Sequence, residues 1–150
     1  MPKYNISPGL QNVGSYQVSG KPFASGSITT ALNTARCIKF PYLTRWIIVT
    51  NHGTDQVLRV GFSEGGINGA DAIHGNPGEA GNYYFRIPPK ISSGDDKQMQ
   101  MSTQRLEMKV SEIWIKGSNN VDVVAGLTNI PATAVANADG RNWTGSVGVG

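Results

Sequence analysis

Short runs of apolar and polar residues alternate along the chain with a period of two, which places successive side chains on opposite faces of a β-strand. Apolar residues share one face in residues 28–32, 58–62 and 83–87. The longest pattern is RLEMKVSEIWIKGSNNVDVVAGLTNI, residues 105–130, in which two alternating runs meet at Gly-Ser-Asn-Asn. Because this tetrapeptide is typical of a turn, we interpret the stretch as a β-hairpin.

Nine segments are predicted strands, and no helical periodicity extends beyond about two turns. The strands are residues 15–18, 27–32, 36–40, 45–51, 56–62, 83–87, 98–102, 105–116 and 121–128. Asn51 at the end of the fourth strand, followed by Gly53 and Asp55, predicts a turn and hence a second hairpin over residues 45–62. Strands joined without helices favour antiparallel sheets, and each sheet must bury one face. We therefore predict an all-β fold, a single jelly-roll antiparallel β-sandwich of about eight strands.

The apolar residues of the longest pattern change phase in its first half. They occupy even positions from 106 to 110 and odd positions at 113 and 115. A slip of one residue moves every side chain to the other face, so the change near Ser111 and Glu112 predicts a β-bulge or a stretch buried on both faces. From Val121 to Leu127 the alternation is unbroken.

Two segments do not have a strand pattern. Residues 64–82 contain six glycines, which predicts a long loop, and residues 131–150 are rich in small residues. We therefore divide the chain into a jelly-roll domain with an N-terminal arm, residues 1–130, and a C-terminal tail or arm, residues 131–150.

The net charge of +3, from 13 Lys and Arg against 10 Asp and Glu, is too small to indicate nucleic-acid binding. Its distribution is uneven, because residues 1–60 include six cations and one anion, whereas residues 63–82 contain Glu64, Asp71 and Glu79 and no cation. Complementary surfaces of this kind would favour self-association. The alternative is scattered surface charge exposed to solvent.

Residues suited to catalysis or metal binding are few. The only histidines are His52 and His74, and Cys37 is the only cysteine, so the clustered spacing of a zinc site is absent. We predict that Cys37 is a buried structural thiol, that His52 is a turn residue, and that His74 is exposed or contacts a ligand. No constellation predicts an enzyme or a cofactor, and no apolar run is long enough to span a membrane.

Residues 108–130, MKVSEIWIKGSNNVDVVAGLTNI, preceded by an all-β pattern and followed by a Gly/Ala tail, resemble the closing strands of single jelly-roll capsid proteins from large icosahedral double-stranded DNA viruses. The resemblance implies a structural virion protein, most specifically a penton protein that forms homopentamers at five-fold vertices, or a minor capsid protein. The implied partners are further copies and other capsid proteins, with no specific nucleic acid. The implied location is the virion, after synthesis in the host cytoplasm.

The expected contacts between subunits come from the glycine-rich loop and the tail. They are Glu64, Asp71, Glu79, Arg141 and Trp143. Trp143 is expected to pack either on its own sandwich or on a neighbour. Asn142-Trp143-Thr144 also matches the glycosylation pattern, and we interpret this as a chance match because no signal peptide is evident.

The alternative function is a lectin-like, carbohydrate-binding module, because lectins share the sandwich architecture. Such a module would present aromatic rings at its loop tips. The candidates are Tyr42, Tyr83 and Tyr84.

Overall fold

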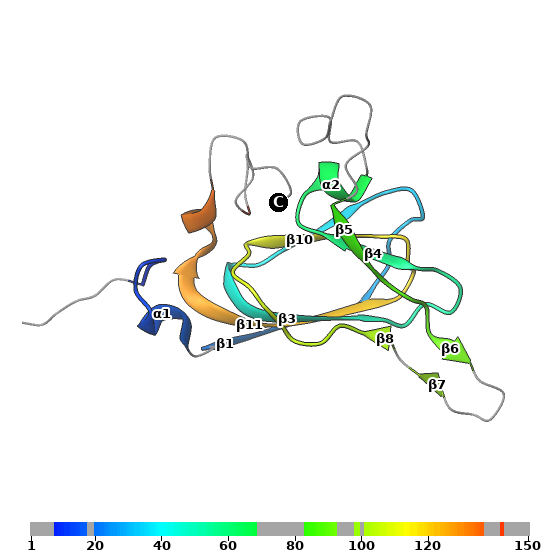
Figure 1. Ribbon diagram of the computed structural model, residues 1–150, viewed down its shortest axis with the longest axis horizontal. Helices are drawn as coiled ribbons and strands as arrows, with labels where there is room; N and C mark the ends of the chain where they lie inside the picture. Colours follow the sequence, from blue (N-terminus) through cyan, green and yellow to red (C-terminus); the bar gives the residue numbers. More distant parts are fainter. Residues whose placement is uncertain are drawn as a thin grey trace, which may run out of the picture.

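A computed structural model describes residues 8–17, 20–68, 83–92, 98–99, 101–136 and 142 of the chain. Two antiparallel sheets pack face to face with almost no helix, so the predicted all-β sandwich is confirmed (Figure 1).

Each large sheet is assembled from strands that are distant in sequence. Sheet A has the order β1 (Lys21–Ile28), β11 (Val121–Pro131), β3 (Tyr42–Asn51) and β8 (Met101–Ser102), and β9 (Leu106–Glu107) also pairs with β3. Sheet B has the order β2 (Arg36–Lys39), β10 (Glu112–Lys116), β4 (Leu58–Gly61) and β5 (Tyr84–Ile87). A small third sheet pairs β6 (Ile91–Ser92) with β7 (Gln98–Met99). If β8 and β9 are counted as one interrupted strand, the sandwich has the eight strands and the crossing connections of a jelly roll.

The core lies between the two sheets and is formed by alternate residues of each strand. In β11 the alternation from Val121 to Leu127 points inward, and these side chains are at most 2% exposed. Ile47 and Val49 of β3 complete the inner face of sheet A, and Ile113 and Ile115 of β10 face them from sheet B. The unbroken alternation predicted for this strand is confirmed by this burial. Each fully buried Val, Leu or Ile side chain stabilises the fold by about 1.5–3 kcal/mol.

The predicted hairpin over residues 105–130 is wrong. β10 pairs with β2 and β4 in sheet B, whereas β11 pairs with β1 and β3 in sheet A. The turn between them therefore crosses the end of the sandwich. Gly117 adopts a φ of 100° there, and a Cβ atom at this position would lie 2.7 Å from the Val57 carbonyl oxygen. Only glycine fits this corner.

The second predicted hairpin, over residues 45–62, is wrong for the same reason. β3 belongs to sheet A and β4 to sheet B, so the intervening turn is another corner of the sandwich. Period-two alternation is the same whether a strand pairs with its neighbour in sequence or faces it across the core.

The phase change near Ser111 marks a transfer of the chain from sheet A to sheet B. β9 pairs with β3, and β10 with β2 and β4, so the predicted strand over residues 105–116 is interrupted rather than bulged. The Thr44 hydroxyl donates to the Met108 carbonyl (2.7 Å) and accepts from the Val110 amide (3.1 Å). Val110 and Ser111 are both buried, which accounts for the shift in apolar phase.

Two further predicted segments differ from the structure. The predicted strand over residues 15–18 is instead the short helix α1 (Gly14–Gln17), where the Asn12 side chain accepts a hydrogen bond from the Gly14 amide (3.1 Å). The strand predicted over residues 27–32 begins earlier and ends at Ile28, leaving Leu32 60% exposed.

Besides α1, two further short helical segments of the described residues flank the sandwich. The predicted loop over residues 64–82 begins with the helix α2 (Glu64–Asn68), whose Ile67 is buried over Gly61. A 3₁₀ turn, η1 (Ala132–Val135), follows β11, and its Val135 packs in a second small core.

Candidate functional site

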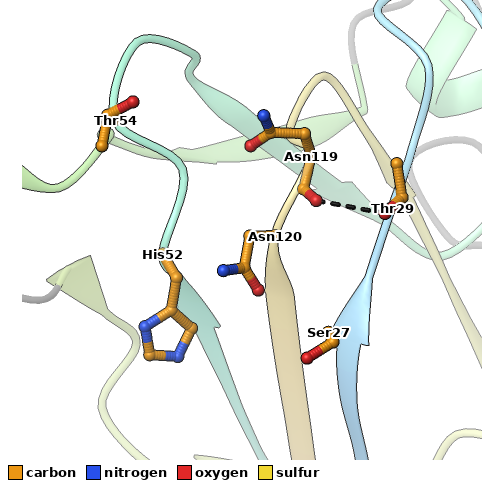
Figure 2. Close-up of a pocket in the computed structure, with 6 residues that line it drawn as sticks. All are labelled: Ser27, Thr29, His52, Thr54, Asn119 and Asn120. Carbon is orange, nitrogen blue, oxygen red and sulfur yellow. Dashed lines mark hydrogen bonds between the residues drawn. The ribbon is translucent and has the colours of Figure 1, made fainter.

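Three connections meet at one end of the sandwich (Figure 1). They are the β1–β2, β3–β4 and β10–β11 loops. Their residues line a polar pocket of about 440 Å³ that is open to solvent. Figure 2 shows the lining residues, all of them hydrogen-bonding side chains: Ser27, Thr29, His52, Thr54, Asn119 and Asn120. All except His52 are exposed, so the pocket presents amides and hydroxyls to solvent.

The Asp122 carboxylate connects two of the residues that line the pocket, His52 and Ser27. One carboxylate oxygen lies 2.9 Å from His52 Nε2, and the other accepts the Ser27 amide hydrogen at 2.8 Å. Ser27 has a φ of 55°, where β1 loses its regular pairing with β11. His52, predicted to be a turn residue, follows β3 directly and links that strand to β11.

The His52–Asp122 pair does not have the geometry of a nucleophilic triad. In a triad the imidazole stands between the hydroxyl and the carboxylate, whereas here the carboxylate stands between His52 and Ser27. Among the described residues, no hydroxyl or thiol is hydrogen-bonded to His52, and no group of three His, Cys, Asp or Glu side chains could hold a metal ion. The pocket is therefore suited to recognition through hydrogen bonds.

The Asn51 side chain links the end of β3 to the end of β5 and to the β10–β11 loop through hydrogen bonds. Its fully buried amide donates to the carbonyl oxygens of Ile87 (3.2 Å) and Pro88 (3.0 Å), and its oxygen accepts from the Ser118 hydroxyl (2.7 Å). The sequence suggested only a turn residue here. An asparagine that ends an apolar strand was the available signal.

Part of the outer face of sheet A is apolar, where six residues form two neighbouring rows bordered by polar residues such as Thr50 and Glu107. Ala24, Val124 and Ile48 are aligned across β1, β11 and β3, and Pro22, Gly126 and Trp46 form the next row; we call these six residues the apolar face. Val124 is 42% exposed, and Trp46 and Ile48 are half-buried. Sheet A is the lower layer in Figure 1, where the described helices lie beside and above it.

The outer face of sheet B is cationic near the loop end of the sandwich. Lys116, Arg59 and Arg86 are direct cross-strand neighbours on β10, β4 and β5, and we call them the basic row. The Arg59 guanidinium lies 4.8 Å from the centre of the Tyr84 ring, and Lys116 Nζ contacts the Asn68 side chain at 2.9 Å. Net charge did not reveal this row, because its members come from three distant segments.

Of the predicted subunit contacts, the structure places only Glu64, which is exposed as the first residue of α2. Asp71, Glu79, Arg141 and Trp143 lie outside the described residues, as does His74. The structure therefore does not test whether these side chains come together.

Sequence reasoning missed Asn142, which binds the sandwich where the chain changes sheets. Its oxygen accepts hydrogen bonds from the Ser111 amide (2.5 Å) and the Glu112 amide (3.1 Å), and its nitrogen donates to the carbonyl oxygens of Phe62 (3.2 Å) and Glu112. Asn142 is 1% exposed and has a φ of 58°, a region that asparagine tolerates. Its buried amide is not accessible to glycosylation, in agreement with a chance match.

The aromatic residues considered for sugar binding are half-buried rather than exposed at loop tips. Lys21 Nζ lies 3.5 Å from the centre of the Tyr42 ring, and Arg59 covers Tyr84. One face of each of these two rings is therefore occupied. Cys37 is also half-buried, in contrast to the buried thiol that was predicted.

A scan against protein-family models, a search of curated proteins and a search of solved structures each found no match. Among the described residues, no helix has the length and apolar character needed to cross a membrane. Inferences about function consequently depend on the fold and on the pocket and faces described above.

Proposed function

We propose that this protein is a structural virion protein, a single jelly-roll capsid component that needs no cofactor and catalyses no reaction. The penton role, as homopentamers at five-fold vertices, is the favoured one, and a minor capsid role is the alternative. The apolar face is the observation that supports this proposal. Apolar residues extend across three neighbouring strands of sheet A, and contiguous apolar surface of this kind marks association sites.

The size of the apolar face suits the centre of an interface. Three strands at about 4.8 Å spacing and two rows of residues cover a patch about 14 Å on each side, while a standard interface buries roughly 800 Å² on each partner. Polar residues around the patch would therefore form the rim, as in other interfaces. In a closed ring the apolar face of one copy meets a different surface of the next copy.

The acidic residues Glu64, Asp71 and Glu79 and the tail residues Arg141 and Trp143 belong to this proposal as further contacts. Glu64 is exposed on α2 and accessible to a neighbour. Opposite charge on two meeting surfaces would orient the copies and speed their encounter.

Native mass spectrometry of the full chain tests the proposal. We expect closed oligomers whose mass is a small integer multiple of the 16.0 kDa chain, with five copies for a penton protein. Electron micrographs of the same sample should show rings. A protein that remains monomeric at every concentration would contradict the assembly role.

Charge neutralisation tests the proposed acidic contacts. Glu64→Gln, Asp71→Gln and Glu79→Gln together should weaken assembly and reduce its dependence on salt, because screened attractions between surface charges are removed. If assembly and its salt dependence were unchanged, the acidic loop would not lie at a subunit contact.

The loop-end pocket favours a second candidate, a carbohydrate-binding module. Its neutral amides and hydroxyls match the hydroxyl groups of a sugar, although its lining contains no aromatic ring. A glycan array distinguishes the candidates: binding by a monomer that Asn120→Ala abolishes would support the lectin-like role over the capsid role.

A further inference from the structure

The basic row concentrates positive charge on a protein whose net charge is small. Neighbouring strands are about 4.8 Å apart, so Lys116, Arg59 and Arg86 span only about 10 Å. Like charges placed directly opposite each other in a sheet destabilise it. None of the three forms an ion pair within the described part of the chain. An anionic ligand would relieve this repulsion.

Within the described part of the chain, Glu112 and Glu64 are carried by elements of the sheet B side, and neither forms an ion pair with the row. Glu112 is at the opposite end of β10, where its Oε1 accepts a hydrogen bond from Trp114 Nε1 at 3.2 Å. Glu64 is exposed at the start of α2. Among the described residues, no carboxylate therefore pairs with Arg59 or Arg86.

Aromatic residues accompany these cations on the outer face of sheet B. Tyr84 is half-buried next to the row with Arg59 stacked on its ring, and Trp114 precedes Lys116 by two positions on the same face. Grooves that bind single-stranded nucleic acid combine cations along the backbone with rings for the bases. We propose that this face binds single-stranded nucleic acid without sequence preference, with phosphates on the basic row and a base on Tyr84.

The combination of a ring with the cations favours a single strand over other polyanions. A duplex presents phosphates but keeps its base faces stacked, and a sulfated polysaccharide has charges but no aromatic bases. The basic row and the apolar face are on opposite sheets, so the proposed nucleic-acid site does not use the apolar face.

Fluorescence anisotropy of labelled oligo(dT) with the full chain, at several salt concentrations, tests the proposal. Each phosphate contact on a single strand contributes about −0.7 to the slope of log K against log salt, so three contacts predict a slope of about −2. Arg86→Gln should reduce the slope to about −1.4 and weaken binding about fivefold near 0.1 M salt.

Arg105→Gln is the matched control, because it removes the same charge from the edge of sheet A, where Arg105 is exposed and pairs with Glu107. It should bind oligo(dT) like the wild type. If the two variants bound equally well, or if the wild-type chain did not bind oligo(dT) at low salt, the proposal would be wrong.

Tyr84→Leu separates nucleic acid from a general polyanion. Loss of one stacked base should weaken oligo(dT) binding about tenfold while heparin binding stays unchanged. A melting curve confirms that the variant is folded. If both ligands lost affinity equally, or neither did, Tyr84 would not contact a base and the nucleic-acid proposal would be overturned.

Discussion

The outer faces of sheets A and B differ although the two sheets share one core. Their inward positions have the same character, Val, Leu and Ile, because both sheets bury one face against the other. Outward, sheet A presents the apolar face and sheet B the basic row. Folding constrains the inward residues and leaves the outward ones freer to vary, so the difference between the outer faces is informative about function.

Strand length accompanies this difference. β3 and β11 of sheet A have 10 and 11 residues, whereas the strands of sheet B have four or five. Sheet A can therefore offer a broad, continuous surface. Sheet B is shorter and is partly covered by α2, whose Ile67 lies over Gly61.

The largest expected effect is on stability, and it tests whether sheet B depends more than sheet A on the hydrogen bonds of Asn142. Asn142→Ala removes a buried side chain that binds Ser111, Glu112 and Phe62, all on the side of sheet B. We expect the free energy of unfolding to fall by about 3 kcal/mol, because buried amides lose their acceptor and alanine disfavours a positive φ. Urea denaturation measures the loss, and hydrogen exchange should rise in β10 before it rises in β3.

Asn119→Ala is the control for this prediction, because the exposed Asn119 side chain has no hydrogen bond among the residues that the structure describes. Its cost should be within about 0.5 kcal/mol. Equal losses in the two variants would show that Asn142 does not support sheet B.

An intermediate effect is expected from a charge on the apolar face. Val124→Lys places an ammonium group at the proposed interface, where an unpaired buried charge costs well over 1 kcal/mol, so oligomers should dissociate at least about tenfold more readily. Val57→Lys is the matched control, because Val57 is 46% exposed at the loop end and Val124 is 42% exposed. Native mass spectrometry compares them, and identical oligomers would exclude the apolar face as the contact.

The smallest effect concerns the basic row. Arg86→Gln removes the cation opposite Arg59 and should raise the free energy of unfolding by about 0.5 kcal/mol. Arg105→Gln should not raise the free energy of unfolding. It breaks an exposed ion pair with Glu107 that contributes at most about 1 kcal/mol. Thermal unfolding measures both. A destabilised Arg86→Gln would mean that the two arginines do not repel each other.

The sites were far less predictable than the strands. Asn142 and Ser111 are 31 positions apart, and Lys116 pairs with Arg59 across a still longer separation. No local pattern signals such contacts. Glu64 is exposed, as expected for a charged residue in a glycine-rich segment, but the residues it would meet are not determined by that segment.

The sequence by itself determined most of the strands, the buried side of the regular ones, and hence the sandwich, because period-two alternation is a local property of the chain. The tertiary structure alone decided which strands pair. It showed that residues 105–130 turn a corner between sheets rather than forming a hairpin. Pairing depends on packing across the core between distant segments, and both the apolar face and the basic row exist only once that pairing has aligned their residues.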